Sequence, residues 1–370
     1  ETVYRVSEAG DTYATCALVL AALSVAAFVV ADALIPAVGA QCLAARTQLW
    51  GRDRAKPGRP RVPESLGTVI GAVYLVVVAL FQPFVRHMVA DFNAALTATT
   101  FMLLLGFADD VLDLRWSVKI VLSFVATVPL LAGYTGLTTV VVPLPLRVAA
   151  LGNVHIVDLG WLYYAYMVLF AVFCTNSINI YAGVNGLEVG QSLVIAVAVL
   201  VHALLSLFTG ERGQPLAEHA PPNDNYLLAV WLVLPFIAVS GALFKHNRYP
   251  SGVFVGDSFT YFAGMSLAVI AILGHFSKTT MMLFAPQLIN FALSLPQLFR
   301  IVPCPRHRLP DYNAKTNRLE NSRNLTLLNA YLYAFGPTHE ATLTAHLMLF
   351  QALCAAAALF VRHVVSRYVF

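Results

Sequence analysis

Two adjacent carboxylates, Asp109 and Asp110, stand at the end of an apolar stretch of the chain. Ionised groups there are costly unless they have a partner, so their presence needs a reason. A carboxylate pair suits Mg²⁺ binding or the positioning of a phosphate nucleophile, and Lys119, a little further along, suits phosphate charge. The segment therefore indicates phosphate chemistry, with a solvated helix end as the alternative.

A second polar segment, residues 174–188, carries amides instead of positive charges. Asn176 and Asn179 are spaced to share one face of a helix. Asparagine supplies a neutral oxygen ligand for Mg²⁺ and N–H donors for a phosphate or a uracil ring. Gly183 and Gly186 allow the backbone to come close to a ligand. The segment contains no lysine or arginine, so general solubility does not explain its polarity; helix-end capping and a turn are the alternative.

A Gly-Asp pair, Gly256 and Asp257, opens a later apolar run. Asp257 is either a simple N-cap of that helix or the partner of an asparagine from residues 174–188 in a cation site. Phe254, just before it, is suited to stacking on a base. The residues alone leave both interpretations open.

Residues 303–310 place cations between prolines, in the order Pro-Cys-Pro-Arg-His-Arg-Leu-Pro. Arg306, His307 and Arg308 form in this way a rigid array of donors that fits a diphosphate and sugar hydroxyls. A positively charged membrane anchor is the alternative. The basic residues of the segment 52–56 are, by themselves, best explained by attraction to anionic lipid.

Long apolar segments must hold these residues in place. Of the 370 residues, 59% are hydrophobic and only 11% charged, with a mean hydropathy of +0.72. Soluble domains carry about 25% charged residues, so most of this chain faces lipid or other apolar helices. A spanning helix needs ~20 largely apolar residues, and this rule predicts an all-α membrane protein with about ten spans. The predicted spans are residues 13–38, 65–85, 94–108, 117–131, 161–175, 187–208, 226–244, 258–275, 279–301 and 341–365.

The loops between these spans differ in charge. Residues 138–158, rich in Val, Pro and Leu, predict an extended hairpin at the membrane surface instead of a span. Alternate loops lie on opposite sides, and most of the 23 lysine and arginine residues fall on one set of loops. The positive-inside rule makes that set cytoplasmic and puts both termini outside. Every polar cluster described above belongs to the same set, which predicts an enzyme site facing the cytoplasm.

Other features narrow the class of protein. A net charge of +4 is too small to indicate a nucleic-acid partner. The five cysteines are scattered without a CxxC pair, which favours reduced or lipid-buried thiols. The first residue is Glu1 instead of Met, so we expect a chain that has been trimmed or processed.

Taken together, five segments resemble the motifs of the polyprenyl-phosphate N-acetylhexosamine-1-phosphate transferase superfamily, in particular its eukaryotic dolichyl-phosphate branch. In family order they are residues 63–65, 106–110, 176–188, 253–257 and 303–308. The resemblance spans nearly the whole chain. The Pro-Cys-Pro-Arg-His-Arg segment is specific for this branch, because the bacterial MurNAc-pentapeptide enzymes carry a His-rich motif there.

The resemblance implies an Mg²⁺-dependent enzyme of the endoplasmic reticulum membrane. It would transfer GlcNAc-1-phosphate from UDP-GlcNAc to dolichyl phosphate, giving GlcNAc-PP-dolichol and UMP, the first step of N-glycan lipid precursor synthesis. Residues 1–370 would form one integral-membrane domain, with residues 300–325 as its cytoplasmic loop for sugar and diphosphate. A homodimer is left open, because the sequence does not give the oligomeric state.

The same resemblance implies roles for individual residues. Asn179 and Asp257 would be the Mg²⁺ ligands, and Asp109, Asp110 and Lys119 the catalytic residues. The aspartates either position the acceptor or form a covalent aspartyl intermediate. The implied substrate contacts are Arg52, Asp53, Arg54, Glu64, Asn185 and Phe254 for uridine, Asn176 for the acceptor phosphate, and Arg306, His307 and Arg308 for the diphosphate and GlcNAc.

Two other functions fit part of the pattern. A secondary transporter would place ionisable residues near the bilayer midplane on broken helices, and Asp32 is the main such residue within a predicted span. A transferase of the same superfamily with another UDP-HexNAc donor, such as UDP-GalNAc, or another polyprenyl acceptor is the second alternative.

Overall fold

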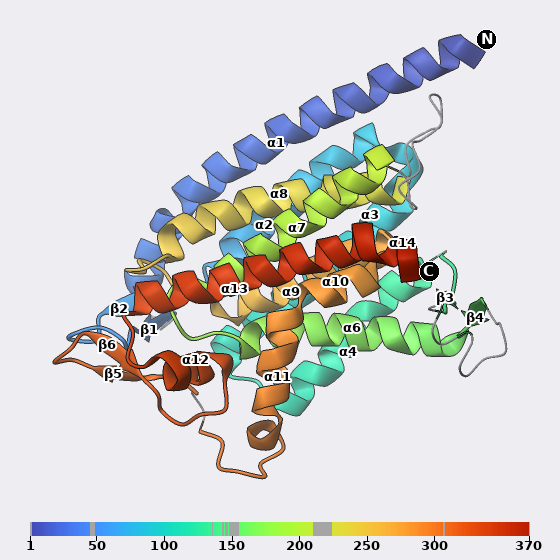
Figure 1. The fold of residues 1–370 in the computed structure, drawn as a ribbon. Coiled ribbons are helices and arrows are strands. Elements are labelled where there is room, and N and C mark those ends of the chain that lie inside the picture. Colours follow the sequence, from blue (N-terminus) through green and yellow to red (C-terminus); the bar gives the residue numbers. More distant parts are fainter. Residues whose placement is uncertain are drawn as a thin grey trace.

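A bundle of long apolar helices forms the body of the protein (Figure 1). The computed structural model describes residues 2–44, 49–134, 136–142, 144, 147, 155–209, 224–305 and 308–369. Within these ranges, eight helices are long and apolar enough to cross a membrane. They lie in α1 (Thr2–Ala44), α2 (Gly67–Phe81), α3 (Val89–Leu112), α6 (Trp161–Ile180), α7 (Leu187–Thr209), α8 (Asp224–Asn247), α9 (Gly256–Leu273) and α13 (Glu340–Phe360).

The other two predicted spans are helical but irregular. α4 (Trp116–Ala132) is apolar and has only 17 residues. α10 (Ser277–Leu283) and α11 (Ala285–Leu298) meet at an angle of 68°, so the span predicted over residues 279–301 is a broken one. Pro286 in the first turn of α11 explains the break, because proline lacks the N–H that would continue the helical ladder of α10. In Figure 1, α11 runs steeply across the direction of its neighbours.

α9 is the central helix and is buried along nearly its whole length. It packs most extensively against α3 and α6. The approach to α3 is closest at Gly106, where an added Cβ would lie 2.5 Å from the Ser258 Cα and 2.6 Å from the Asp257 carbonyl oxygen. Only glycine permits this approach, which brings Asp109 and Asp110 beside the first turn of α9.

Two short antiparallel hairpins cover one end of the bundle. β1 (Trp50–Arg52) pairs with β2 (Arg61–Pro63), and β5 (Asp311–Asn313) pairs with β6 (Arg318–Glu320). The short helix α12 (Leu327–Phe335) lies at the same end (Figure 1). These elements belong to the first and last of the loops that the charge pattern assigns to one side.

The third hairpin lies at the opposite end of the bundle, toward which both ends of the chain point (Figure 1). β3 (Thr139–Val141) pairs with β4 (Ile156–Asp158), so the described part of the segment 138–158 is extended, as predicted. The shorter elements are η1 (Gln82–Phe84), η2 (Arg86–Met88), the π-helix η3 (Val361–Val365) and α14 (Ser366–Val369).

A small apolar cluster, separate from the main core, fastens the β5–β6 hairpin and α12 to the bundle. It joins Leu319 of β6 and Leu328 and Leu332 of α12 to Leu343 of α13 and to Tyr181, which follows α6. Each fully buried side chain of this size stabilises the fold by about 1.5–3 kcal/mol. The cluster therefore holds the hairpin region firmly over the polar end of the helices.

Candidate active site

A cavity of about 660 Å³ opens at the end of the bundle that carries β1, β2, β5 and β6. Five segments that are distant in sequence contribute to its wall, with Arg54, Lys119, Asn179, Asp257 and Arg308 as one residue from each. The structure therefore brings the polar segments of the sequence to one site.

Most residues that the sequence singles out line this cavity. Those in its wall are Arg52, Asp53, Arg54, Glu64, Lys119, Asn176, Asn179, Asn185, Phe254, Asp257 and Arg308. Asp109 and Asp110 lie behind the wall and are not among its lining residues. Arg306 and His307 lie outside the described residues.

Asp109 is a buried carboxylate whose main partner is the Lys119 ammonium, at 2.6 Å. It also accepts hydrogen bonds from the Leu114 N–H at 3.0 Å and from the Tyr261 hydroxyl at 3.4 Å. The lysine, in contrast, lines the cavity. This geometry makes Asp109 the group that holds Lys119 in place and balances its charge.

Asp110 caps the N-terminus of α9. Its two carboxylate oxygens accept the backbone N–H of Asp257 at 2.6 Å and that of Ser258 at 3.1 Å, and the Ser65 hydroxyl also donates to it. The first N–H groups of a helix have no partner within the helix, so this carboxylate supplies one. Gly256 has φ +73°, and any Cβ there would collide with the Asp110 carboxylate. Asp110 thus fixes where α9 begins.

Asn179 and Asp257 come together in the wall of the cavity. The Asn179 Nδ2 donates to Asp257 Oδ1 at 2.7 Å and to Thr260 Oγ1 at 3.2 Å. The Lys119 ammonium lies 3.7 Å from the other Asp257 oxygen. A carboxylate and an amide from two different segments therefore face one space, with a cation beside them.

This pair has the right chemistry for Mg²⁺. Carboxylate and amide oxygens are the ligands that the ion prefers, and it commonly takes only one or two carboxylates, with waters and substrate phosphates completing its shell. No cluster of three or more His, Cys, Asp or Glu side chains suited to a metal occurs in the described part of the chain. The donors thus fit an ion shared with a phosphate ligand better than one enclosed by protein alone.

Arg308 brings a second cation to the cavity wall. Its Nη1 is buried and has no hydrogen-bond partner among the described residues. Burial lowers the pKa of this guanidinium, but an arginine remains protonated in proteins. A buried donor without a partner costs about 1–3 kcal/mol, which a phosphate oxygen bound in the cavity would offset.

Phe254 and Glu64 form the wall next to β2. The Phe254 N–H donates to the Pro63 carbonyl oxygen at 2.7 Å, which ties the aromatic residue to the strand. Burial and the nearby charge of Asp110 raise the pKa of Glu64. An aromatic face beside a carboxyl group suits a nucleoside, with the base on the ring and hydroxyls on the carboxyl oxygens.

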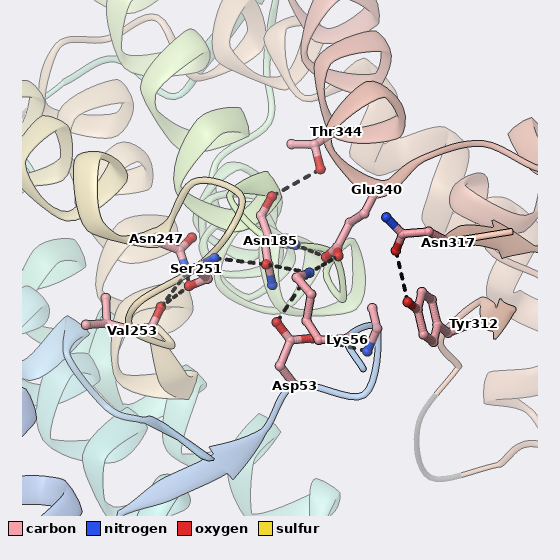
Figure 2. A network of polar contacts seen from close by, with 11 residues as sticks. Asp53, Lys56, Asn185, Asn247, Ser251, Val253, Tyr312, Asn317, Glu340 and Thr344 are labelled. Atoms are coloured by element: carbon pink, nitrogen blue, oxygen red, sulfur yellow. Dashed lines mark hydrogen bonds and ion pairs between the residues drawn. The ribbon is translucent and has the colours of Figure 1, made fainter. Parts of the chain in front are cut away.

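Two further asparagines contribute differently. The Asn176 Nδ2 donates to the Val172 carbonyl oxygen at 2.8 Å, so this amide is partly engaged by its own helix. The Asn185 Oδ1 accepts from the Lys56 ammonium and from the Ser251 N–H, both at 3.1 Å (Figure 2). Both residues still line the cavity.

Sequence reasoning missed some residues of the site. Lys56 attracts attention only as one of several basic residues, yet it binds Glu340 at the first residue of α13. Thr260 and Trp116 also line the cavity. A carboxylate at the start of an apolar span was the available signal for Glu340, but nothing in the spacing links it to Lys56, because 284 positions separate the two.

Comparison with known proteins is consistent with this geometry. The family described as glycosyl transferase family 4 matches residues 92–275. The UDP-N-acetylglucosamine–dolichyl-phosphate N-acetylglucosaminephosphotransferase of Dictyostelium discoideum is 45% identical over 89% of this chain and 85% of its own length. The Saccharomyces cerevisiae protein of that name is 37% identical over 94% of this chain and 91% of its own length.

A probable undecaprenyl-phosphate N-acetylglucosaminyl 1-phosphate transferase of Bacillus subtilis is more distant, at 26% identity over 50% of this chain and 45% of its own length. The family match over residues 92–275 includes Lys119, Asn179 and Asp257 of the cavity wall. The chain therefore belongs to glycosyl transferase family 4, within the group that contains these dolichyl-phosphate N-acetylglucosaminephosphotransferases.

Proposed function

We propose that this protein transfers GlcNAc-1-phosphate from UDP-GlcNAc to dolichyl phosphate, giving GlcNAc-PP-dolichol and UMP. The observation that carries the proposal is the placement of the Asn179–Asp257 oxygen pair, Lys119 and the Arg308 Nη1, which has no partner among the described residues, around one cavity. The names of the relatives supply the donor and the acceptor.

The reaction is an in-line displacement at the phosphorus that carries the sugar. An oxygen of the acceptor phosphate forms the new P–O bond, the bond to the UMP oxygen breaks, and UMP leaves with the electron pair. A phosphate monoester is already mostly ionised at pH 7, so no strong base is required. Lys119 and Arg308 offset the charge that accumulates on the diphosphate, which is most of what phosphoryl transfer requires.

Mg²⁺ is part of the proposal. Asp257 and Asn179 would hold the ion, which when bound neutralises phosphate charge. Asp109 keeps Lys119 oriented toward the same phosphates, and Asp110 keeps Asp257 at the first turn of α9. In this account the aspartate pair acts by positioning, and a covalent aspartyl intermediate is the competing mechanism.

The apolar acceptor needs a route from the membrane. Trp116 at the start of α4 and Leu298 at the end of α11 both line the cavity. Trp116 is 60% exposed, and Ile289 and Leu293 of α11 are also exposed. An isoprenoid chain arriving between these helices would bring its phosphate directly to Lys119 and Asn176, which line the same cavity.

We further propose that the cavity faces the cytoplasm from the endoplasmic reticulum membrane. Most positive charges lie on the loops that form it, in keeping with the positive-inside rule. A single-cysteine probe at exposed Lys315 of the β5–β6 loop, labelled by an impermeant reagent in sealed microsomes, tests this orientation. Homodimerisation also stays a prediction, which the mass of the detergent-purified protein tests.

A radiolabel assay tests the reaction itself. Purified protein, dolichyl phosphate and Mg²⁺ with sugar-labelled UDP-GlcNAc should yield a labelled lipid that releases GlcNAc on mild acid treatment, and label placed on the β-phosphate of the donor should enter the same lipid. Substituting UDP-GalNAc tests the alternative donor, and an undecaprenyl acceptor tests lipid selectivity. The absence of any labelled lipid with every donor would refute a transferase. The transporter alternative loses its main support, because Asp32 pairs with Lys245 and His246, both at 2.8 Å.

A further inference from the structure

A buried polar network, which we call the Lys56 network, joins four segments of the chain (Figure 2), and Asp53, Asn185 and Glu340 of this network line the cavity. The Lys56 ammonium binds the Glu340 carboxylate, lies 3.4 Å from an Asp53 oxygen and donates to Asn185 Oδ1 at 3.1 Å. It also lies 4.1 Å from the centre of the Tyr249 ring. Only 12% of the lysine side chain and 4% of the Glu340 side chain are exposed, so these charges are almost fully withdrawn from water.

The network fixes the orientation of the Asn185 amide. Lys56 and the backbone N–H of Ser251 approach the same amide atom, both at 3.1 Å. A lysine ammonium and a backbone N–H can only donate, so the atom between them must be the carbonyl oxygen. Rotating the amide by 180° would place its NH₂ group against two donors, so the Ser251 N–H would lose its acceptor and Lys56 would lose one of its partners.

The backbone of Asn185 is held just as firmly. Its N–H donates to Glu340 Oε1 at 2.7 Å, and its carbonyl oxygen accepts from the Thr344 hydroxyl at 3.1 Å. Glu340 therefore serves twice, since one oxygen holds the Asn185 backbone and the other holds Lys56. The remaining polar atom is Nδ2, which has no partner within the described chain, although Asn185 lines the cavity. Asn185 thus presents a donor, and not an acceptor, to a ligand.

A fixed donor distinguishes pyrimidine bases. Uracil carries a carbonyl oxygen at C4, whereas cytosine carries an amino group there, which also donates. Phe254 lines the same cavity and offers a face for stacking a base. We propose that Lys56 and Glu340 are positioning residues that lock the Asn185 Nδ2 toward the uracil C4 carbonyl and so select uridine over cytidine donors. The inference rests on the proposed use of a UDP-sugar.

Competition by UDP and CDP tests the inference, with their inhibition constants measured against UDP-GlcNAc transfer by the purified protein. For the wild type we expect CDP to bind more weakly. In Lys56→Met, which removes one of the two donors to the Asn185 oxygen, the ratio of the CDP to the UDP inhibition constant should fall by about tenfold, since a freed amide can turn its oxygen toward an amino group. Glu340→Gln releases a partner of Lys56 and leaves both donors in place, so it should lower the ratio by a smaller factor. The kcat for UDP-GlcNAc should fall far less than its KM rises.

Three variants keep the test decisive. Lys56→Arg retains a donor-only cation and should preserve the ratio. The double variant Lys56→Met/Glu340→Gln removes both buried charges together, so it provides a folded protein if either single variant leaves an unpaired charge that prevents folding. Lys315→Met, at an exposed lysine of the β5–β6 loop, is the matched control and should leave both constants unchanged.

The outcomes separate this inference from the proposed reaction. A wild type that transfers GlcNAc-1-phosphate but shows the same CDP-to-UDP ratio in all Lys56 and Glu340 variants would overturn the selectivity role, even if both constants rise together. A wild type that is inhibited by neither nucleotide and forms no lipid product would instead overturn the reaction.

Discussion

Asp110 offers a direct test of whether the acidic pair acts by position or by chemistry. Its carboxylate serves three donors, namely the backbone N–H groups of Asp257 and Ser258 and the Ser65 hydroxyl. Hydrogen bonds to a charged group contribute about 1.5–3 kcal/mol each, and loss of a helix cap costs about 0.5–2 kcal/mol. We expect Asp110→Ala to lower the free energy of unfolding by about 3–5 kcal/mol, below the sum of three bonds because water can replace part of them.

The same change should weaken the cation site. Asp257 sits in the turn that Asp110 holds, and residues that orient a metal ligand typically contribute 10- to 100-fold to metal affinity. Asp110→Asn keeps the size and one acceptor oxygen, but its NH₂ group faces a donor. We therefore expect this variant to need about tenfold more Mg²⁺ for half-maximal transfer, together with a smaller loss of stability than Asp110→Ala.

Two measurements decide the matter: thermal unfolding of the detergent-purified protein, and transfer rate as a function of Mg²⁺ concentration. Asp311→Asn, at the exposed first residue of β5, is the matched control and should change neither. An Asp110→Asn protein with normal stability, whose strongly reduced transfer reaches half its maximum at the wild-type Mg²⁺ concentration, would refute the positioning role. Such a result would instead favour a carboxylate that takes part in the reaction.

Further predictions concern the cations, the metal and pH. Lys119→Met should lower kcat/KM by about 100-fold, with Lys119→Arg recovering part of it, as steady-state kinetics will report. Arg308→Lys should raise the KM for UDP-GlcNAc by about tenfold, because the paired donors of the guanidinium are lost. Chelation by EDTA should abolish transfer and added Mg²⁺ should restore it; full activity in EDTA would exclude a metal requirement. The Glu64 pKa is raised, so its contribution to stability is greatest below the usual glutamate pKa and is lost as pH rises through the raised value. The stability of Glu64→Gln relative to wild type should therefore be greater at pH 8 than at pH 5. A difference in melting temperature between the two proteins that is the same at both pH values would contradict this.

The helices were predictable because their signal is local. A membrane-spanning helix needs about twenty largely apolar residues, a pattern that can be recognised within one segment. Each of the ten predicted segments contains helix, and eight of the described helices are long and apolar enough to span a membrane. The break between α10 and α11 has a local cause in Pro286, but the surrounding residues stay apolar through it, and hydropathy alone does not show a bend. The gathering of polar loops was predictable for a related reason, since charge sorts loops by side.

The roles of individual side chains were harder to predict. Asp109 and Asp110 are neighbours in sequence and look equivalent, yet one binds Lys119 and the other caps α9. That difference depends on which side of α3 faces α4 and which side faces α9. The pattern of apolar residues does not show on which of these sides each aspartate lies. Lys56 and Glu340 illustrate the same limit, because their pairing follows from how the first loop and α13 pack, and neither residue carries a local motif.

The first turn of α9 explains why so many distant residues are needed for one site. Asp257 contacts Asn179 of α6 and Lys119 of α4, and its backbone is held by Asp110 of α3. Gly256 lets that backbone bend where any side chain would strike Asp110. A shift of any one of these helices would therefore move the carboxylate away from its amide or its lysine. Because α9 is also the most buried helix, the core that stabilises the bundle is the same structure that sets the distances within the site.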